Sequence, residues 1–290
     1  MRPRVAVAGL LLATLTGCSG GGQEDAAAAP VGSTAAKAST RPGAAPRTAA
    51  DFLARAERAT AGEKGWTFAV RGREALLAQG QENAATYAAT VHRTTRSPWA
   101  LHSTGTTHRE GTDSPEEIYV VDGTAYVKEG GTGTWRHGPL TDPEYANKVE
   151  DPVAVLDAFR TYTGDDTPGG GVSLVTSGGG VELRVRTAKA ALPAVRERGV
   201  VRRAVRELAP TLKQLRANGV AAPDARITVE SAEESLVLDP STYRITSHTF
   251  RCVFLVPYGG GGIRYSQEVT ERNQGAYAGG VALLDGVGRG

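Results

Sequence analysis

The chain has 290 residues with 33 basic and 31 acidic side chains, 40% apolar residues and only two cysteines. This composition excludes a collagen-like or coiled-coil fibre, a disulfide-stapled miniprotein and a strongly basic nucleic-acid binder. No apolar run reaches the roughly 20 residues that a membrane-spanning helix needs, which excludes a multispan transporter.

Residues 1–17 have the pattern of a lipoprotein signal peptide. Arg2 and Arg4 precede an apolar run, Val5–Leu15, that is too short for a permanent membrane anchor. The run leads into Leu-Thr-Gly-Cys at 15–18, which resembles the bacterial lipobox, whose cysteine is lipidated and becomes the new N-terminus. We expect Cys18 to carry acyl chains such as palmitate and to anchor the protein at the extracytoplasmic face of the cell membrane. The alternative is an ordinary secretory signal with an incidental cysteine.

Residues 18–49 have the composition of a disordered tether. Between 19 and 48, 23 of 30 residues are Ala, Gly, Ser, Thr or Pro. Such a segment buries too little apolar surface to offset the conformational entropy that it would lose on ordering. Removal of residues 1–17 would leave 31 basic and 31 acidic residues. Because such a chain is formally neutral, we expect it to contact the membrane through its lipid and to bind no nucleic acid.

The first half of the remaining chain, 50–290, begins with a helix and continues with strands. Apolar residues at helical spacing predict a helix over 50–60, which Gly62 ends. Residues then alternate between apolar and polar, which predicts strands. Asp122-Gly123 lies between two such segments and predicts a two-residue hairpin. The expected strands cover 66–71, 86–92, 117–121 and 124–129, and a further strand is expected to start at Trp99 and Leu101.

Two further helical stretches follow, at 151–162 and 191–218. In the second, an apolar stripe recurs every three or four residues, Pro210 should kink the helix, and Asn218-Gly219 ends it. Asp165-Asp166 and Glu233-Glu234 are expected in turns. The later strands are expected at 172–176, 181–188, 226–230, 235–239, 242–257, 263–272 and 277–284.

These elements predict an α+β fold. Short turns between neighbouring strands favour a large antiparallel sheet, a half-barrel of about 11 strands. A few helices, mainly 191–218, should cover its concave face. Since a helix cannot contact every strand of a curved sheet, the architecture predicts an apolar gap for a small hydrophobic ligand.

The chain resembles the actinobacterial LppX/LprAFG lipoproteins, which have a LolA-like fold. The order of elements is similar over about 50–284, while the arginine-rich run 196–206 and the glycine-rich turn 259–262 depart from the family pattern. The resemblance implies a cavity between half-barrel and helices that holds the acyl chains of lipids or lipoglycans for transport. The segments that carry it are 15–18, 66–71, 119–127 with Trp135, 151–156, 208–215, 225–230 and 236–240.

The inward residues of strands and helix are the candidates for contact with such a ligand. A closed version of the same fold would use the same residues as simple core. The candidates are Trp66, Phe68, Val70, Tyr87, Val91, Leu183, Val185, Leu208, Leu212 and Leu215.

No catalytic motif is present in the sequence. It lacks a nucleophile elbow, a zinc-protease helix and a phosphate-binding loop, and its five histidines do not pair at metal-ligand spacing. We therefore expect no enzymatic activity, no cofactor and no metal site. Cys252 alternates with Phe250 and Phe254, which favours a small buried side chain over a reactive thiol.

Five arginines lie in the run 196–206. They form either a solvated helix face or a docking patch for anionic head groups near the cavity mouth. They are Arg196, Arg198, Arg202, Arg203 and Arg206.

Two functions fit the whole sequence. The first is a monomeric lipid carrier or chaperone without catalysis. The second is an envelope interaction or sensor protein in which the LolA-like fold is closed and its surface binds another protein.

Overall fold

The computed structural model describes residues 45–130, 133–165, 168–177, 180–283 and 287. The expected signal peptide, the expected lipidation site Cys18 and nearly all of the expected tether lie outside the described residues. Residues Pro46–Gly290 form one compact unit, and the fold below is that of the described part of this unit.

Segments of alternating apolar and polar residues build one antiparallel sheet, which contains twelve strands within the described ranges. The strand order is β6-β5-β4-β3-β2-β1-β12-β11-β10-β8-β7, and β9 pairs with β10. Strands from opposite ends of the unit, β1 and β12, therefore pair in the middle of the sheet. The bounds are β1 Gly65–Ala78, β2 Gln81–Thr94, β3 Leu101–Arg109, β4 Thr112–Val121, β5 Thr124–Glu129, β6 Arg136–Pro139, β7 Ser173–Ser177, β8 Gly180–Thr187, β9 Ala190–Ala191, β10 Thr228–Leu238, β11 Ile245–Tyr258 and β12 Gly261–Ala276.

Two-residue turns connect the long strands. Asp122 and Gly123 have φ values of 49° and 74°, the left-handed backbone that a tight hairpin needs at both central positions. Gln79-Gly80, Glu110-Gly111 and Gly259-Gly260 repeat this pattern. The hairpin that the sequence predicts at Asp122-Gly123 is confirmed.

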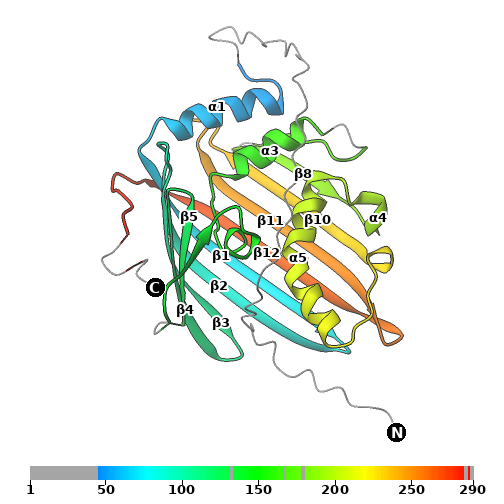
Figure 1. The fold of residues 1–290 in the computed structure, drawn as a ribbon. Coiled ribbons are helices and arrows are strands. Elements are labelled where there is room, and N and C mark those ends of the chain that lie inside the picture. The colour runs from blue at the N-terminus through cyan, green and yellow to red at the C-terminus, as the bar shows by residue number, and fades with distance from the viewer. Residues whose placement is uncertain (1–44, 131–132, 166–167, 178–179, 284–286, 288–290) are drawn as a thin grey trace, which may run out of the picture. The chain divides into compact units, whose positions relative to one another are not determined.

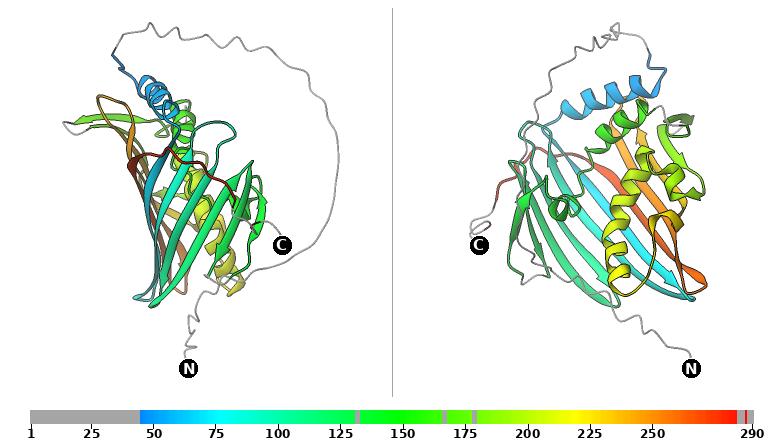
Figure 2. Two further views of the ribbon diagram at one scale, coloured as in Figure 1. Left: turned by 90° about the vertical axis from the view of Figure 1, so that its left-hand side faces the viewer. Right: turned by 45° about the vertical axis from the view of Figure 1, so that its right-hand side comes forward.

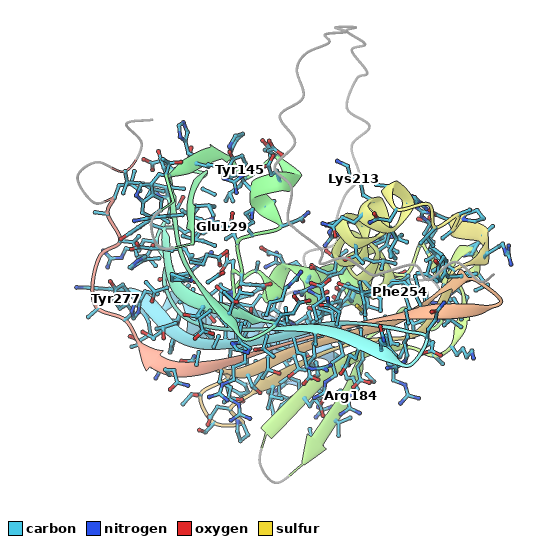
Figure 3. The ribbon with its side chains drawn as sticks, turned by 90° about the horizontal axis from the view of Figure 1, so that it is seen from below. Glu129, Tyr145, Arg184, Lys213, Phe254 and Tyr277 are labelled. Atoms are coloured by element: carbon cyan, nitrogen blue, oxygen red, sulfur yellow. The ribbon has the colours of Figure 1, made fainter. Side chains whose placement is uncertain are left out.

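The helices lie on one side of the sheet, as both views in Figure 2 show. In Figure 1, α5 crosses the face of β8, β10, β11 and β12, while α1 runs along one end of the sheet. Seen from below, β1 to β5 curl up on the side that carries α5, so this side is concave (Figure 3). The helices are α1 Ala49–Ala61, α2 Pro143–Ala146, α3 Val155–Thr163, α4 Leu192–Val195, α5 Gly199–Ala217 and the 3₁₀ turn η1 Asp224–Arg226.

The fold class that the sequence predicts, a large curved antiparallel sheet with a few helices on its concave face, is confirmed. An apolar stripe on α5 packs against the inward residues of the sheet. Ala204 and Leu208 of this stripe are fully buried, as are Leu183 and Phe250 of the sheet. Burial of a leucine or phenylalanine side chain contributes about 1.5–3 kcal/mol, so the stripe holds α5 on the sheet.

Three expected elements differ from the structure. The segments 226–230 and 235–239 belong to one strand, β10, so Glu233-Glu234 does not lie in a turn. The expected strand 277–284 is wrong, because 277–283 is irregular. Strand β12 before it already pairs with β1 on one edge and β11 on the other. The expected helix 191–218 is divided, since Arg198 between α4 and α5 has an extended ψ of 133°.

Candidate functional site

The concave face carries polar side chains as well as the apolar core. Strand register places them next to one another, since His248 lies opposite Glu271 and Glu234 lies opposite Phe250. Alternate residues of each strand face α5. Most of these inward residues are apolar, but a few are charged and therefore lie on the same concave face.

The structure places nine of the ten candidate ligand residues in one buried core beneath the helices. Tyr87 is the tenth, and it is partly exposed. Because the nine already belong to one packed core, the part of the face near Tyr87 is more accessible than they are. The nine are Trp66, Phe68, Val70, Val91, Leu183, Val185, Leu208, Leu212 and Leu215.

Glu234 is the centre of a buried polar cluster. Its carboxylate accepts hydrogen bonds from the hydroxyl of Tyr162 at 2.7 Å and from Nη1 of Arg203 at 2.6 Å. Nε2 of His248 lies 2.9 Å from the same carboxylate, and Nδ1 of His248 lies 2.8 Å from Glu271. These five residues, the Glu234 cluster, connect α3 and α5 to β10, β11 and β12.

The charges in the Glu234 cluster stabilise one another. Burial opposes ionisation of Glu234, but Arg203 and the hydrogen bond from His248 outweigh it and lower the pKa of Glu234 to about 2. Burial also disfavours a charged His248, but the nearby carboxylates of Glu271 and Glu234 outweigh it and raise its pKa to about 9. At neutral pH the cluster therefore contains a charged imidazole between two carboxylates.

The segment before α3 adds two carboxyl groups to this region. Burial, and then the negative charge of Glu271, raise the pKa of Glu150 to about 7. Asp151 forms a two-pronged ion pair with Arg93 of β2, at 3.1 and 3.2 Å, and Arg93 also lies over the ring of Trp99. Burial raises the pKa of Asp151 against the opposing effect of Arg93. The ion pair fixes the start of α3 to the sheet.

Tyr87 marks the more accessible part of the concave face. Its ring crosses Gly105, where a Cβ atom would lie only 2.8 Å from the ring. Burial, and then the nearby charge of Glu116, raise the pKa of the Tyr87 hydroxyl well above its usual value. Ala89, two positions further along the same face of β2, and Leu76, which lies opposite Asn83 on the same face of β1, are also only partly buried.

The arginine run does not form one exposed face. Arg203 points into the Glu234 cluster and lies over the ring of Phe250, 4.5 Å from its centroid. Arg196, Arg202 and Arg206 are exposed, and Arg196 forms an ion pair with Asp224 at 2.7 Å. Neither of the two sequence interpretations anticipated an inward arginine.

Sequence reasoning missed the members of the Glu234 cluster, although a signal was present for two of them. Glu234 occupies the same face of β10 as Ala232 and Leu236, and both of these are buried. His248 precedes Phe250 and Cys252 on the inward face of β11. A charged residue at an inward position of a strand requires buried partners, so this pattern could have identified both.

The thiol of Cys252 is buried, and burial raises its pKa well above the usual value, which agrees with a small core side chain. In the described ranges, no three His, Cys, Asp or Glu side chains are arranged to ligate a metal. None of the described helices combines the length and the apolar character that crossing a membrane requires.

The chain matches no family model, and no curated protein sequence is significantly similar to it. Several solved structures are similar. LprF from Mycobacterium bovis shares 14% identity over 83% of this chain and 97% of its own, with a TM-score of 0.34. A DUF1329 family protein from Desulfovibrio piger shares 6% identity over 81% of this chain and 95% of its own, with a TM-score of 0.30.

Proposed function

We propose that this protein is an extracytoplasmic lipoprotein, anchored by lipidated Cys18, that holds a lipid or another hydrophobic ligand on the concave face of its sheet. The proposal involves no catalytic step. It follows the resemblance of the sequence to LppX/LprAFG lipoproteins, and it is supported by the curved sheet, whose concave face is the kind of surface on which hydrophobic ligands bind.

One observation carries the proposal. Leu76, Tyr87 and Ala89 lie on the concave side of β1 and β2, and all three remain partly exposed. The apolar stripe of α5 covers the concave face of β8, β10 and β11. It does not fully cover Leu76, Tyr87 and Ala89, which a ligand could contact. Burial of this apolar surface by an acyl chain would contribute roughly 25 cal/mol per Å².

The test is extraction of purified protein with organic solvent, followed by mass spectrometry. Leu76→Glu places a charge on the concave face, and Leu77→Glu places the same charge on the exposed outer face of the same strand. We expect about one lipid per native chain, much less with Leu76→Glu and an unchanged amount with Leu77→Glu. Thermal unfolding of both variants checks that they are folded. Absence of lipid from the native chain would contradict the proposal.

A second function, an envelope interaction or sensor protein with a closed core, is favoured by a different observation. Nine of the ten candidate ligand residues are buried in one core cluster, and three of the nine belong to α5 itself. A native chain without any extracted lipid, combined with capture of a defined envelope protein through its surface, would support this second function.

A further inference from the structure

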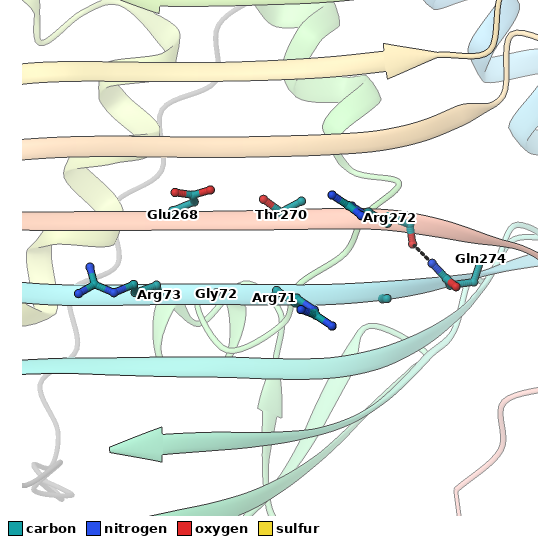
Figure 4. A pocket seen from close by; sticks show the side chains of 8 residues that line it. Arg71, Gly72, Arg73, Glu268, Thr270, Arg272 and Gln274 are labelled. Atoms are coloured by element: carbon teal, nitrogen blue, oxygen red, sulfur yellow. Dashed lines mark hydrogen bonds between the residues drawn. The ribbon is translucent and has the colours of Figure 1, made fainter. Parts of the chain in front are cut away.

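The outer face of the sheet contains a hollow of about 620 Å³ between β1 and β12. Three arginines line it, Arg71 and Arg73 from β1 and Arg272 from β12, together with Thr270 and Gln274 (Figure 4). This hollow lies on the side of the sheet opposite to the Glu234 cluster, since its side chains occupy the alternate positions of both strands.

Among the described residues, two of these arginines have no carboxylate partner. Arg71 lies opposite Ala88 on β2 and Thr270 on β12, and Arg272 lies opposite Ala69 on β1 and Ser247 on β11. None of these four neighbours is acidic. Throughout the described part of the chain, neither Arg71 nor Arg272 forms an ion pair.

Other arginines of this outer face do have such partners. Arg73 pairs with Glu82 at 2.8 Å, Arg251 pairs with Glu268 at 2.8 Å, and Arg264 pairs with Glu230 at 2.9 Å. Glu268, the acidic residue that lines the hollow, is therefore already bound to Arg251. The negative charge of Glu268 therefore does not neutralise Arg71 and Arg272 at the hollow.

The strand register places the two unpaired charges on the same face of adjacent strands. Arg71 and Arg272 occupy diagonal positions of adjacent strands, where side chains of this length can reach one another. Both are exposed, and the methyl group of Ala69 between them leaves room for a bound group. An anion between the guanidinium groups would remove the repulsion between these like charges and supply the missing acceptors.

We propose that this hollow binds a phosphate group between Arg71 and Arg272. Each guanidinium can donate two parallel hydrogen bonds to a phosphate, which offers more acceptor positions than a carboxylate. The Thr270 hydroxyl and the Gln274 amide add neutral donors at the rim of the hollow. The phosphate can be a free anion or part of a phospholipid head group.

The experiment uses the full chain with Cys18→Ser, so that acyl chains on the protein do not contribute to vesicle binding. One arm measures inorganic phosphate by calorimetry. The other measures sedimentation with phosphatidylcholine vesicles that contain or lack phosphatidylglycerol. Arg71→Gln and Arg272→Gln are the test variants. Arg264→Gln is the matched control, because its guanidinium lies on a strand of the same sheet and already has a carboxylate partner.

We expect each test variant to weaken binding at least tenfold and the control to change it less than twofold. Loss in the calorimetric arm identifies a free phosphate site, and loss in the phosphatidylglycerol arm alone identifies a head-group site. The proposal is overturned if neither probe binds, or if binding is the same in the test variants and the control. The amount of lipid extracted from the concave face is measured in parallel, so failure of this site is distinguishable from failure of the carrier function.

Discussion

Nε2 of His248 lies 2.9 Å from the carboxylate of Glu234, and both side chains are buried. The other ring nitrogen lies 2.8 Å from Glu271. A carboxylate is a hydrogen-bond acceptor, so both ring nitrogens must donate, which only the protonated imidazole can do. The sheet therefore contains a buried positive charge that depends on two acidic neighbours.

Replacement of His248 by alanine should strongly destabilise the fold. The change leaves Glu234 and Glu271 buried without their shared partner, and loss of one member of a buried charged network costs about 3–5 kcal/mol. Urea unfolding at pH 6 measures this loss. His108→Ala is the control, because His108 pairs with Asp113 on the surface, and it should cost less than about 1 kcal/mol. Equal losses in the two variants would contradict the assigned role.

The free energy of unfolding should decrease as the pH rises from about 6.5 to 9. The pKa of His248 is about 9 in the fold and about 6.5 in an unfolded chain, so its contribution is complete below 6.5 and disappears as the pH passes 9. The charged groups that act on His248 are Glu271 and Glu234, and its charge also acts on Glu150. From α5, Arg203 interacts with Glu234 and Glu150, and Glu207 interacts with Glu150.

Denaturant unfolding across this pH range measures how the free energy of unfolding depends on pH, and His248→Gln should flatten this dependence.

Glu150 acts in the same direction at lower pH. Because its pKa is raised to about 7, the free energy of unfolding should decrease from about pH 4.5 to 7. Glu150→Gln should flatten this lower part alone. Glu234 acts oppositely, and its contribution is lost as the pH decreases through about 2.

Much of the fold could be predicted because its strands have one apolar face. The alternation at Trp66, Phe68 and Val70 and the hairpin residues Asp122-Gly123 identify strands without tertiary information. The expected strand after residue 276 was wrong for a reason that sequence does not show. Whether a segment with strand character pairs depends on a free sheet edge, and β12 has none.

The candidate site was harder to predict, because its charged members come from distant segments. Arg203 lies outside the apolar stripe of α5, so its sequence position predicts exposure, yet Glu234 and Phe250 hold it against the sheet. A buried ion pair needs both partners in space, and residues 203 and 234 are brought together only by the packing of α5. The ten candidate ligand residues were chosen by the same pattern that selects a core, and this pattern cannot separate core from ligand contact.

Arg203→Met should destabilise the fold, whereas Arg202→Met should not. Arg203 donates a 2.6 Å hydrogen bond to buried Glu234, so its removal leaves that charge without its guanidinium and costs about 3 kcal/mol. Arg202, the next residue, is exposed, and its replacement should change stability by less than about 0.5 kcal/mol. Thermal and urea unfolding of the two variants measure the difference. A similar small effect in both would show that Arg203 is solvated.

The close approach of Tyr87 to Gly105 predicts a steric conflict that one substitution creates and a second relieves. A Cβ atom at position 105 would lie 2.8 Å from the Tyr87 ring and 2.9 Å from the Ala89 methyl group. Gly105→Ala should therefore lower the free energy of unfolding by about 1–3 kcal/mol, the usual cost of overpacking. Gly171→Ala is the control, since no atom lies within 4 Å of a Cβ there.

In a Tyr87→Ala background the cost of Gly105→Ala should decrease by at least half, because the ring that causes the closest contact is gone. A double-mutant cycle measured by urea unfolding gives this coupling directly. Additive effects of the two substitutions on the free energy of unfolding would contradict the observed packing. Because Tyr87 borders the exposed part of the concave face, the proposed carrier function also predicts that displacement of its ring by Gly105→Ala alters the amount of lipid extracted with the protein.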